Sequence, residues 1–244
     1  MRFPCLCIGL SLFVCAGAVA APFQDLNFEA ATVEAAPADP TPPDFEFVDP
    51  ISAAAALPGW TVQLDSTVCN TIWGEPAALD QTAVELNSTD AIQGNYDVDL
   101  YSSVYTPGDG SFAIPSISQM GDIPSGTQSI LFDVRSPTVA GGIVEAIPFV
   151  SINGSPIPVF EISSSSGIEQ WGGNVSAFAG TTSELSFSAA GVLGPFPGNE
   201  DLYELDAISF SNQSVPEPAS GALLAIVGAG LLGRRRKRWA PYHS

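Results

Sequence analysis

Basic residues are almost absent from the middle of this 244-residue sequence. Arg2 lies near the N-terminus and five basic residues form one block at 234–238, which leaves Arg135 as the only Lys or Arg between them. All 26 acids lie from Asp25 to Glu217, so with one arginine among them this region carries 25 net negative charges. Such a surface repels phosphate backbones, and we therefore expect no nucleic-acid partner. The charge favours solubility and is compatible with divalent cations.

Cysteine and histidine are also scarce. Three of the four cysteines lie in the first 20 residues, so loss of that segment leaves Cys69 alone and excludes an intramolecular disulfide. The one histidine, His243, lies beyond the basic block, so no Cys–His or Ser–His–Asp arrangement can form in the body. Glycoside hydrolysis needs two carboxylates that flank the scissile bond. In a sequence with 26 acids some pair always seems suitable, so the presence of such a pair does not indicate this activity. We expect that the protein is not an enzyme.

Long helices are the third absence, because no segment of the body has the apolar pattern of a three-turn helix. The 23 Gly and 21 Pro favour turns, and short stretches such as "LPGWTVQL" (57–64), "YDVDLYSSVY" (96–105) and "QSILFDVRS" (128–136) alternate with a period of two. Asn153-Gly154 predicts a tight hairpin turn, and Val175–Phe178 a short helical turn. About ten short strands predict an all-β fold, a single jelly-roll-like β-sandwich over residues 21–213.

Three parts of this body have particular predictions. The stretch "FQDLNFE" (23–29) predicts the first strand, and the Ala/Pro-rich residues 30–56 predict an extended insertion of polyproline character. Leu202, Leu205 and Ile208 are not spaced by two, so we place the last strand at Leu205–Ser211.

The N-terminal segment, residues 1–20, has the features of a signal peptide. Arg2 precedes an apolar stretch at 6–14, and Ala18-Val19-Ala20 has the small-x-small form that signal peptidase cleaves, which predicts cleavage after Ala20. The alternative is lipoprotein processing at Cys15, but Val14 stands where that signal requires Gly or Ala. The segment predicts an exported protein.

The C-terminal segment contains 15 uncharged residues at 219–233, followed by the basic block. As a helix they would span about 22 Å, short of the roughly 30 Å hydrocarbon core. Flanking arginines can extend the span by reaching to the interface, and the basic side stays cytoplasmic. We therefore predict one short transmembrane helix with the body facing outward; a plain C-terminal anchor would have the same pattern.

The order of features in residues 214–238 resembles the PEP-CTERM sorting signal. A Pro-Glu-Pro at 216–218 precedes the apolar stretch 219–233, which precedes the basic cluster 234–238. The resemblance implies recognition by an exosortase, processing near the Pro-Glu-Pro, and release to the cell surface or an exopolysaccharide matrix. The tail "WAPYHS" after the basic cluster departs from the pattern. The residues that carry the resemblance are Val215, Pro216, Glu217, Pro218, Arg234, Arg235, Arg236, Lys237 and Arg238.

The body resembles ectodomains that precede this signal and that are similar to the galactose-binding-like jelly roll. The resemblance rests on "FQDLNFE", "LPGWTV", "SAFAGTTSELSFSA" and "LDAISFS". It implies a structural Ca²⁺ between the first and last strands, near Asn27, Glu29 and Asp206, because Ca²⁺ takes six to eight oxygen ligands. The alternative, which we favour, is that Glu29 and Asp206 are solvated strand acids.

Three tryptophans bear on function. Trp60 lies in an alternating strand and is predicted to be core, whereas Trp73 and Trp171 lie in turn-like contexts and could stack on sugar rings. We predict an exported cell-surface or extracellular-matrix protein with a non-enzymatic structural or adhesive role. The alternatives are a carbohydrate-binding module that retains extracellular polysaccharide and, third, a secreted glycan-active enzyme.

Overall fold

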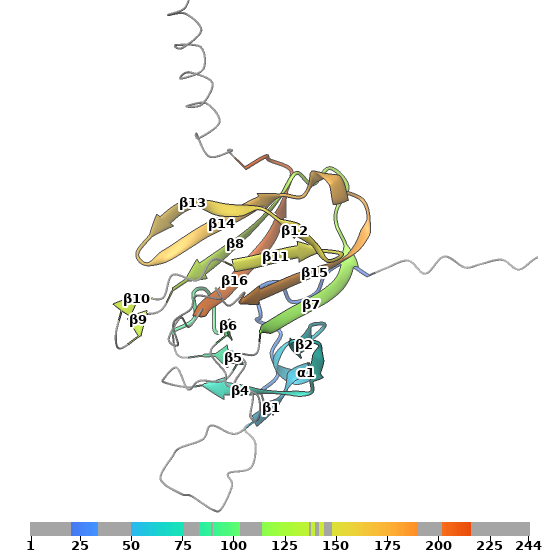
Figure 1. Ribbon diagram of the computed structural model, residues 1–244. Helices are drawn as coiled ribbons and strands as arrows, with labels where there is room; N and C mark the ends of the chain where they lie inside the picture. The colour runs from blue at the N-terminus through green and yellow to red at the C-terminus, as the bar shows by residue number, and fades with distance from the viewer. Residues whose placement is uncertain are drawn as a thin grey trace, which may run out of the picture.

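Two β-sheets make up the body of the protein in the computed structural model (Figure 1). The structure describes residues 21–33, 50–75, 83–88, 90–102, 114–136, 138–139, 142–143, 148–189 and 202–215. Within these residues, the larger sheet has eight strands in the order β1-β4-β5-β6-β16-β8-β14-β13, and the smaller has six in the order β12-β11-β15-β7-β2-β3. The predicted all-β sandwich is confirmed.

The strands are short, and among the described residues all strand pairs within the two sheets are antiparallel except β4 with β5. The large sheet consists of β1 (Pro50–Ser52), β4 (Thr71–Glu75), β5 (Val84–Asn87), β6 (Asp97–Tyr101), β8 (Ser129–Arg135), β13 (Val159–Ser165), β14 (Ile168–Asn174) and β16 (Leu202–Ser211). The small sheet consists of β2 (Thr61–Leu64), β3 (Thr67–Cys69), β7 (Pro115–Asp122), β11 (Pro148–Ile152), β12 (Ser155–Ile157) and β15 (Thr182–Ala189). A separate pair is β9 (Thr138–Val139) with β10 (Gly142–Ile143), and the helices are α1 (Ala53–Ala56) and the 3₁₀ turn η1 (Ser176–Phe178). No described helix exceeds four residues, as the sequence predicts.

The core lies between the two sheets and is closed by aromatic rings. Phe132 of the large sheet meets Phe187 of the small sheet edge to face, with ring centroids 5.2 Å apart. Trp60 contacts Phe187 from the side, at 6.5 Å, and is buried as predicted. Each such side chain stabilises the fold by roughly 1.5–3 kcal/mol through removal of apolar surface from water.

The two predicted turns are present. Asn153 and Gly154 connect β11 to β12, with φ of 50° and 72°. Positive φ at both central residues defines the type I′ turn that matches the twist of a two-stranded hairpin. The predicted helical turn near Val175 is the 3₁₀ element η1.

The predicted first strand at 23–29 is wrong. Pro22 makes one bridge with Asp122, residues 23–25 have no regular structure, and residues 26–30 form turns and a bend. Asp25 and Phe28 have φ of 49° and 56°, a left-handed conformation that cannot continue a strand. Phe28 is nevertheless fully buried, so the apolar residues of this segment indicated burial in the core and not an extended strand.

The insertion predicted at 30–56 is also more ordered at its end than expected. Its last residues form β1 and the helix α1, while residues 34–49 lie outside the described part of the chain. Four consecutive alanines have the highest intrinsic helix propensity, which explains a helical turn where we expected extended backbone.

The last strand is longer than predicted, because β16 begins at Leu202. Its pairing with β8 shifts between Asp206 and Ser209, and Ala207 within this β-bulge has a φ of 52°. A bulge inserts residues into one strand and changes which side chains face the core. This explains why Leu205 and Ile208, both buried, are not spaced by two.

Candidate functional site

The most unusual feature of the molecule is a row of ionisable residues across the large sheet. Strand pairing places Glu85 opposite Asp99, Asp99 opposite Glu204, and Glu204 opposite Arg135. These residues come from four adjacent strands, β5, β6, β16 and β8. Their strand neighbours, such as Val98 and Leu205, point into the core, so the row lies on the outer face.

The acids of this face are buried. The exposed fractions are 0% for Asp97, 5% for Asp99 and 6% for Glu204, and Glu85 and Asp206 are buried as well. Carboxylates are rarely buried unless a cation or hydrogen-bond donors compensate them. Arg135 is the only basic residue that the sequence supplies between residues 3 and 233, so it cannot neutralise all of them.

Arg135 is held by several of these groups at once. Its guanidinium donates to a carboxylate oxygen of Glu204, lies 3.6 Å from Oδ2 of Asp97, and lies 3.4 Å from Oδ2 of the exposed Asp90. It also donates to the backbone carbonyl of Asp90. The planar guanidinium suits such multiple contacts better than an ammonium does. Arg135 therefore fixes one side of the acidic row.

Burial and mutual repulsion change how these acids ionise. Burial, followed by the charge of Glu204, raises the pKa of Asp97 to about 7. Burial raises the pKa of Asp99 well above its ordinary value, and the charges of Glu204, Asp97 and Glu85 act in the same direction. Burial also raises the pKa of Glu204, against the lowering effect of Arg135. At neutral pH these acids must share protons or be compensated by a further cation.

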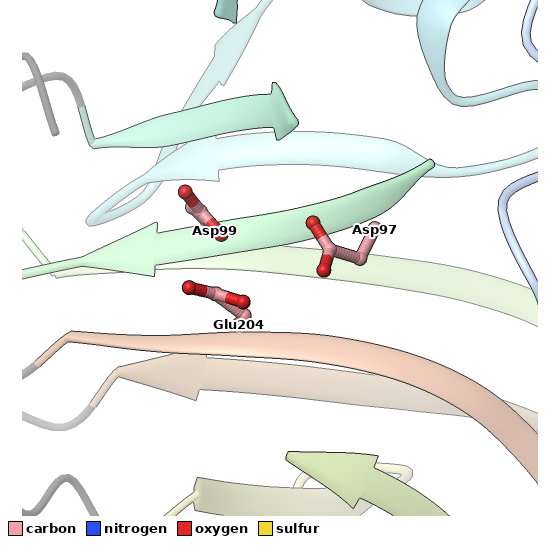
Figure 2. Close-up of side chains that lie close together, drawn as sticks. All are labelled: Asp97, Asp99 and Glu204. Carbon is pink, nitrogen blue, oxygen red and sulfur yellow. The ribbon is translucent and has the colours of Figure 1, made fainter. Parts of the chain in front are cut away.

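Three of the acids converge on one point, namely Asp97 and Asp99 of β6 and Glu204 of β16, which we call the carboxylate cluster. Figure 2 shows their carboxylates facing the same space between the two strands. One oxygen from each lies within 4.8 Å of the other two. Within the described part of the chain, Oδ1 of Asp97 and Oδ1 of Asp99 are buried and have no hydrogen-bond partner. The carboxylate cluster can therefore accept protons or a shared cation.

The predicted calcium residues have a different role. Asn27 is exposed, and Glu29 accepts hydrogen bonds from the Asn95 backbone N–H (2.6 Å), the Asn95 side chain (2.7 Å) and the Tyr96 N–H (3.1 Å). Oδ2 of Asp206 accepts from the Gln93 N–H at 2.8 Å. Both acids thus hold the loop that precedes β6. Asp206 is fully buried and not a solvated acid, and calcium binding at these residues stays a prediction.

The two predicted sugar-binding tryptophans lie in strands and not in exposed turns. Trp171 lies within β14, half-buried, packs against the core, and donates its indole N–H to Glu169 at 2.9 Å. Trp73 lies in β4, and its side chain is outside the described part. A turn-like context for Trp171 is therefore wrong, since Gly172 and Gly173 lie in the same strand as close-packing positions: a Cβ on Gly172 would meet the Ile130 carbonyl at 2.8 Å.

Both terminal signals lie largely outside the described residues. This applies to the signal peptide with Ala18 and Ala20, and to the sorting residues from Pro216 onward, including the basic cluster 234–238. Within the described residues no helix has the length and apolar character required to cross a membrane, and the predicted helix at 219–233 is not among them.

Sequence reasoning did not find the carboxylate cluster. The alternation in "YDVDLY" predicts that Asp97 and Asp99 face away from the core, and an acid on that face is ordinarily solvated. A signal did exist, because Glu204 and Asp206 repeat the same alternation in "LYELD" and Arg135 is the one cation available to all of them.

The fold and this site define the class of protein: an acidic β-sandwich with a buried carboxylate cluster on one sheet. In comparisons with known proteins, the family described as PEP-CTERM protein-sorting motif matches residues 214–237. The chain therefore carries the predicted sorting signal, which marks an exosortase substrate at the cell surface. No curated protein matches.

Among solved structures, TmCBM61, a carbohydrate-binding module in complex with beta-1,4-galactotriose, is similar to this chain. It is 14% identical, with 64% of this chain and 90% of that chain covered and a TM-score of 0.33. A likeness of that extent says nothing of what this chain binds.

Proposed function

We propose that the protein is an exported, non-enzymatic surface or matrix protein that an exosortase processes near its Pro-Glu-Pro. The observation that carries this proposal is the sorting motif at residues 214–237. The signal peptide predicted at residues 1–20 would deliver the chain across the membrane, and the apolar segment 219–233 would hold it there until processing.

The fold is compatible with cleavage at this place. β16 ends at Ser211, and just beyond it the Ser129 hydroxyl donates to the Gln213 carbonyl at 2.7 Å. β16 is an interior strand, paired with β6 and β8. A cut at 216–218 therefore removes no strand from either sheet, and the released body keeps its core.

The tether between body and membrane would be short. From Gln213 to the start of the apolar segment at Ala219 is six residues, which span at most about 20 Å when extended. The processing site would thus lie close to the membrane surface, within reach of a membrane-embedded enzyme. An acidic body favours solubility after release.

Intact-mass spectrometry of the protein from its native host tests this proposal. We expect a chain that begins at Ala21 and lacks the residues after the Pro-Glu-Pro, and a chain that retains them when the exosortase gene is deleted. Glu217→Ala should retain the tail, whereas Glu184→Gln, on the opposite sheet, should be processed normally. A wild-type protein that keeps its tail in a host with active exosortase would contradict the proposal.

Retention of extracellular polysaccharide is the second candidate. Its support is the half-buried indole of Trp171 beside the carboxylate of Glu169, a pairing of apolar face and hydrogen-bond acceptor that suits a sugar. Pull-down with the host's own polysaccharide tests it. Binding that Trp171→Ala abolishes and Glu184→Gln leaves unchanged would support this function, and no binding by the wild type would remove it.

A further inference from the structure

We propose that Asp97, Asp99 and Glu204 form a Ca²⁺ site that ties β6 to β16 in the middle of the large sheet. The site is separate from the sorting signal, and its ligands differ from those of the calcium position that the jelly-roll resemblance implies at Asn27, Glu29 and Asp206. It goes beyond the proposed function, because export requires no metal.

The spacing of the oxygens fits one ion. Ca²⁺ binds oxygens at about 2.3–2.6 Å, so two ligands on opposite sides of the ion lie at most about 5 Å apart. The three carboxylate oxygens of the cluster all lie within 4.8 Å of one another. A single ion among them would lie at most about 2.8 Å from each oxygen, so a small movement of the side chains brings all three to the distance that Ca²⁺ prefers (Figure 2).

The second observation is independent of the clustering. Oδ1 of Asp97 and Oδ1 of Asp99 are buried acceptors that have no hydrogen-bond partner in the described part of the chain. Their residues are 0% and 5% exposed. An unpaired buried acceptor is destabilising, and more so when it is charged, so native proteins seldom leave two side by side. Both oxygens lack a positive partner, which a cation would supply.

Two other oxygens of the cluster are already held by protein donors. Oδ2 of Asp97 accepts the Ile92 N–H at 2.9 Å and lies 3.6 Å from Arg135. Arg135 also binds Oε2 of Glu204. Partners of this kind orient ligating carboxylates and leave the remaining oxygens for the metal. Arg135 thus acts as a positioning residue for the site.

The chemistry of the ligands selects the ion. The cluster offers carboxylate oxygens and no nitrogen or sulfur, which disfavours Zn²⁺. Mg²⁺ requires near-ideal octahedral geometry and usually keeps several waters, which a buried site does not favour. Each of the three carboxylates offers at least one oxygen, and Ca²⁺ accepts such an oxygen set in flexible geometry. Two positive charges would offset the repulsion that Arg135 leaves uncompensated.

Calcium titration of the whole protein tests this site. The protein is produced from its full coding sequence, purified in detergent, stripped with a chelator, and titrated with CaCl₂ in a calorimeter. We expect one Ca²⁺ per chain with a dissociation constant of about 1 mM or lower, the range of extracellular modules. At a Ca²⁺ concentration 100 times the dissociation constant, the ratio of folded to unfolded protein should rise about 100-fold.

Variants locate the ion. Asp99→Asn and Asp97→Asn should each weaken binding at least about tenfold, the loss that follows from removing one charged ligand. Asp99→Asn should also fold without calcium at least as stably as the wild type, because it removes buried repulsion and keeps the pairing of Asp97 and Glu204 with Arg135. Two variants are used so that the result does not depend on one of them folding. Glu184→Gln removes a carboxylate from the other sheet and should bind as the wild type does.

Three results would overturn the site. The first is a wild type that binds no Ca²⁺ in the millimolar range, which would mean that the acids share protons only. The second is Ca²⁺ binding that both Asp97→Asn and Asp99→Asn leave unchanged. The third is binding that Glu29→Gln abolishes while the two cluster variants retain it, which would place the ion beside the loop that precedes β6.

Discussion

Removal of Arg135 should destabilise the protein in a pH-dependent way. Its side chain is 19% exposed, and its partners Glu204 and Asp97 are 8% and 0% exposed. Loss of one partner from a buried ion pair costs about 3–5 kcal/mol, because the other charge stays buried without compensation. Arg135→Met keeps much of the apolar stem and removes the charge, so it isolates the electrostatic part.

Protonation of Glu204 sets the size of the effect. A stranded carboxylate can take up a proton, which from the ordinary pKa of 4.5 costs about 3.4 kcal/mol at pH 7 and about 0.7 kcal/mol at pH 5, at 1.36 kcal/mol per pH unit. Because burial already raises the pKa of Glu204 in the wild type, we expect a loss of about 2–3 kcal/mol at pH 7 and under about 1 kcal/mol at pH 5.

The sign follows from proton uptake. In the variant the pKa of Glu204 in the folded state rises further above its value in the unfolded chain, so the folded state binds more protons. The variant is therefore closest in stability to the wild type below the pKa of Glu204 in the unfolded chain. It loses stability relative to the wild type as the pH rises through the pKa of Glu204 in the folded state.

Urea unfolding followed by tryptophan fluorescence, to which the buried Trp60 contributes, measures this difference at the two pH values, with a chelator present so that cations do not contribute. Arg135→Lys serves as the control. Because it keeps the positive charge, the pH dependence of its free energy of unfolding should be close to that of the wild type. An equal loss at both pH values would mean that only packing of the Arg135 stem was removed, and no loss at pH 7 would refute the electrostatic argument altogether.

Two further predictions follow from the same structure. In the presence of a chelator, the free energy of unfolding of the wild type should fall as the pH rises from about 5 to 8. Burial and the charges of Glu204 and Asp206, against the lowering effect of Arg135, raise the folded-state pKa of Asp97 to about 7, above its unfolded value. Urea unfolding that is independent of pH would contradict this. Gly173→Ala should destabilise the fold by about 1–3 kcal/mol in thermal unfolding, because the new Cβ would lie 2.7 Å from the carbonyl oxygen of Pro158. The control is Ser164→Ala at an exposed position, which should change the free energy of unfolding by no more than about 0.5 kcal/mol.

Much of the fold could be predicted from local patterns. The alternation in "LPGWTVQL" predicted both the strand β2 and the burial of Trp60, and Asn153-Gly154 predicted its hairpin because few other residue pairs accept positive φ twice. Local patterns failed where backbone geometry departed from the ordinary. The turns of residues 23–29 and the bulge at Ala207 both depend on left-handed residues that are not glycine, which no composition rule indicates.

The sequence by itself determined how this protein is sorted. A sorting signal is read as a linear order of short segments, so Pro216–Pro218, the apolar stretch and the basic cluster carry their meaning without a fold. It also determined the sandwich, since strand periodicity and turn residues are local properties of the chain.

Only the tertiary structure decided that the outward-facing acids of β6 and β16 are buried and meet one another. Periodicity reports which side of a strand a residue occupies, but not which strand lies beside it or what covers that side. The alignment of Glu85, Asp99, Glu204 and Arg135 in one row depends on the register of four strands, of which β8 and β16 are distant in sequence from β5 and β6. Register is a long-range property, and so is the concentration of buried negative charge that it produces.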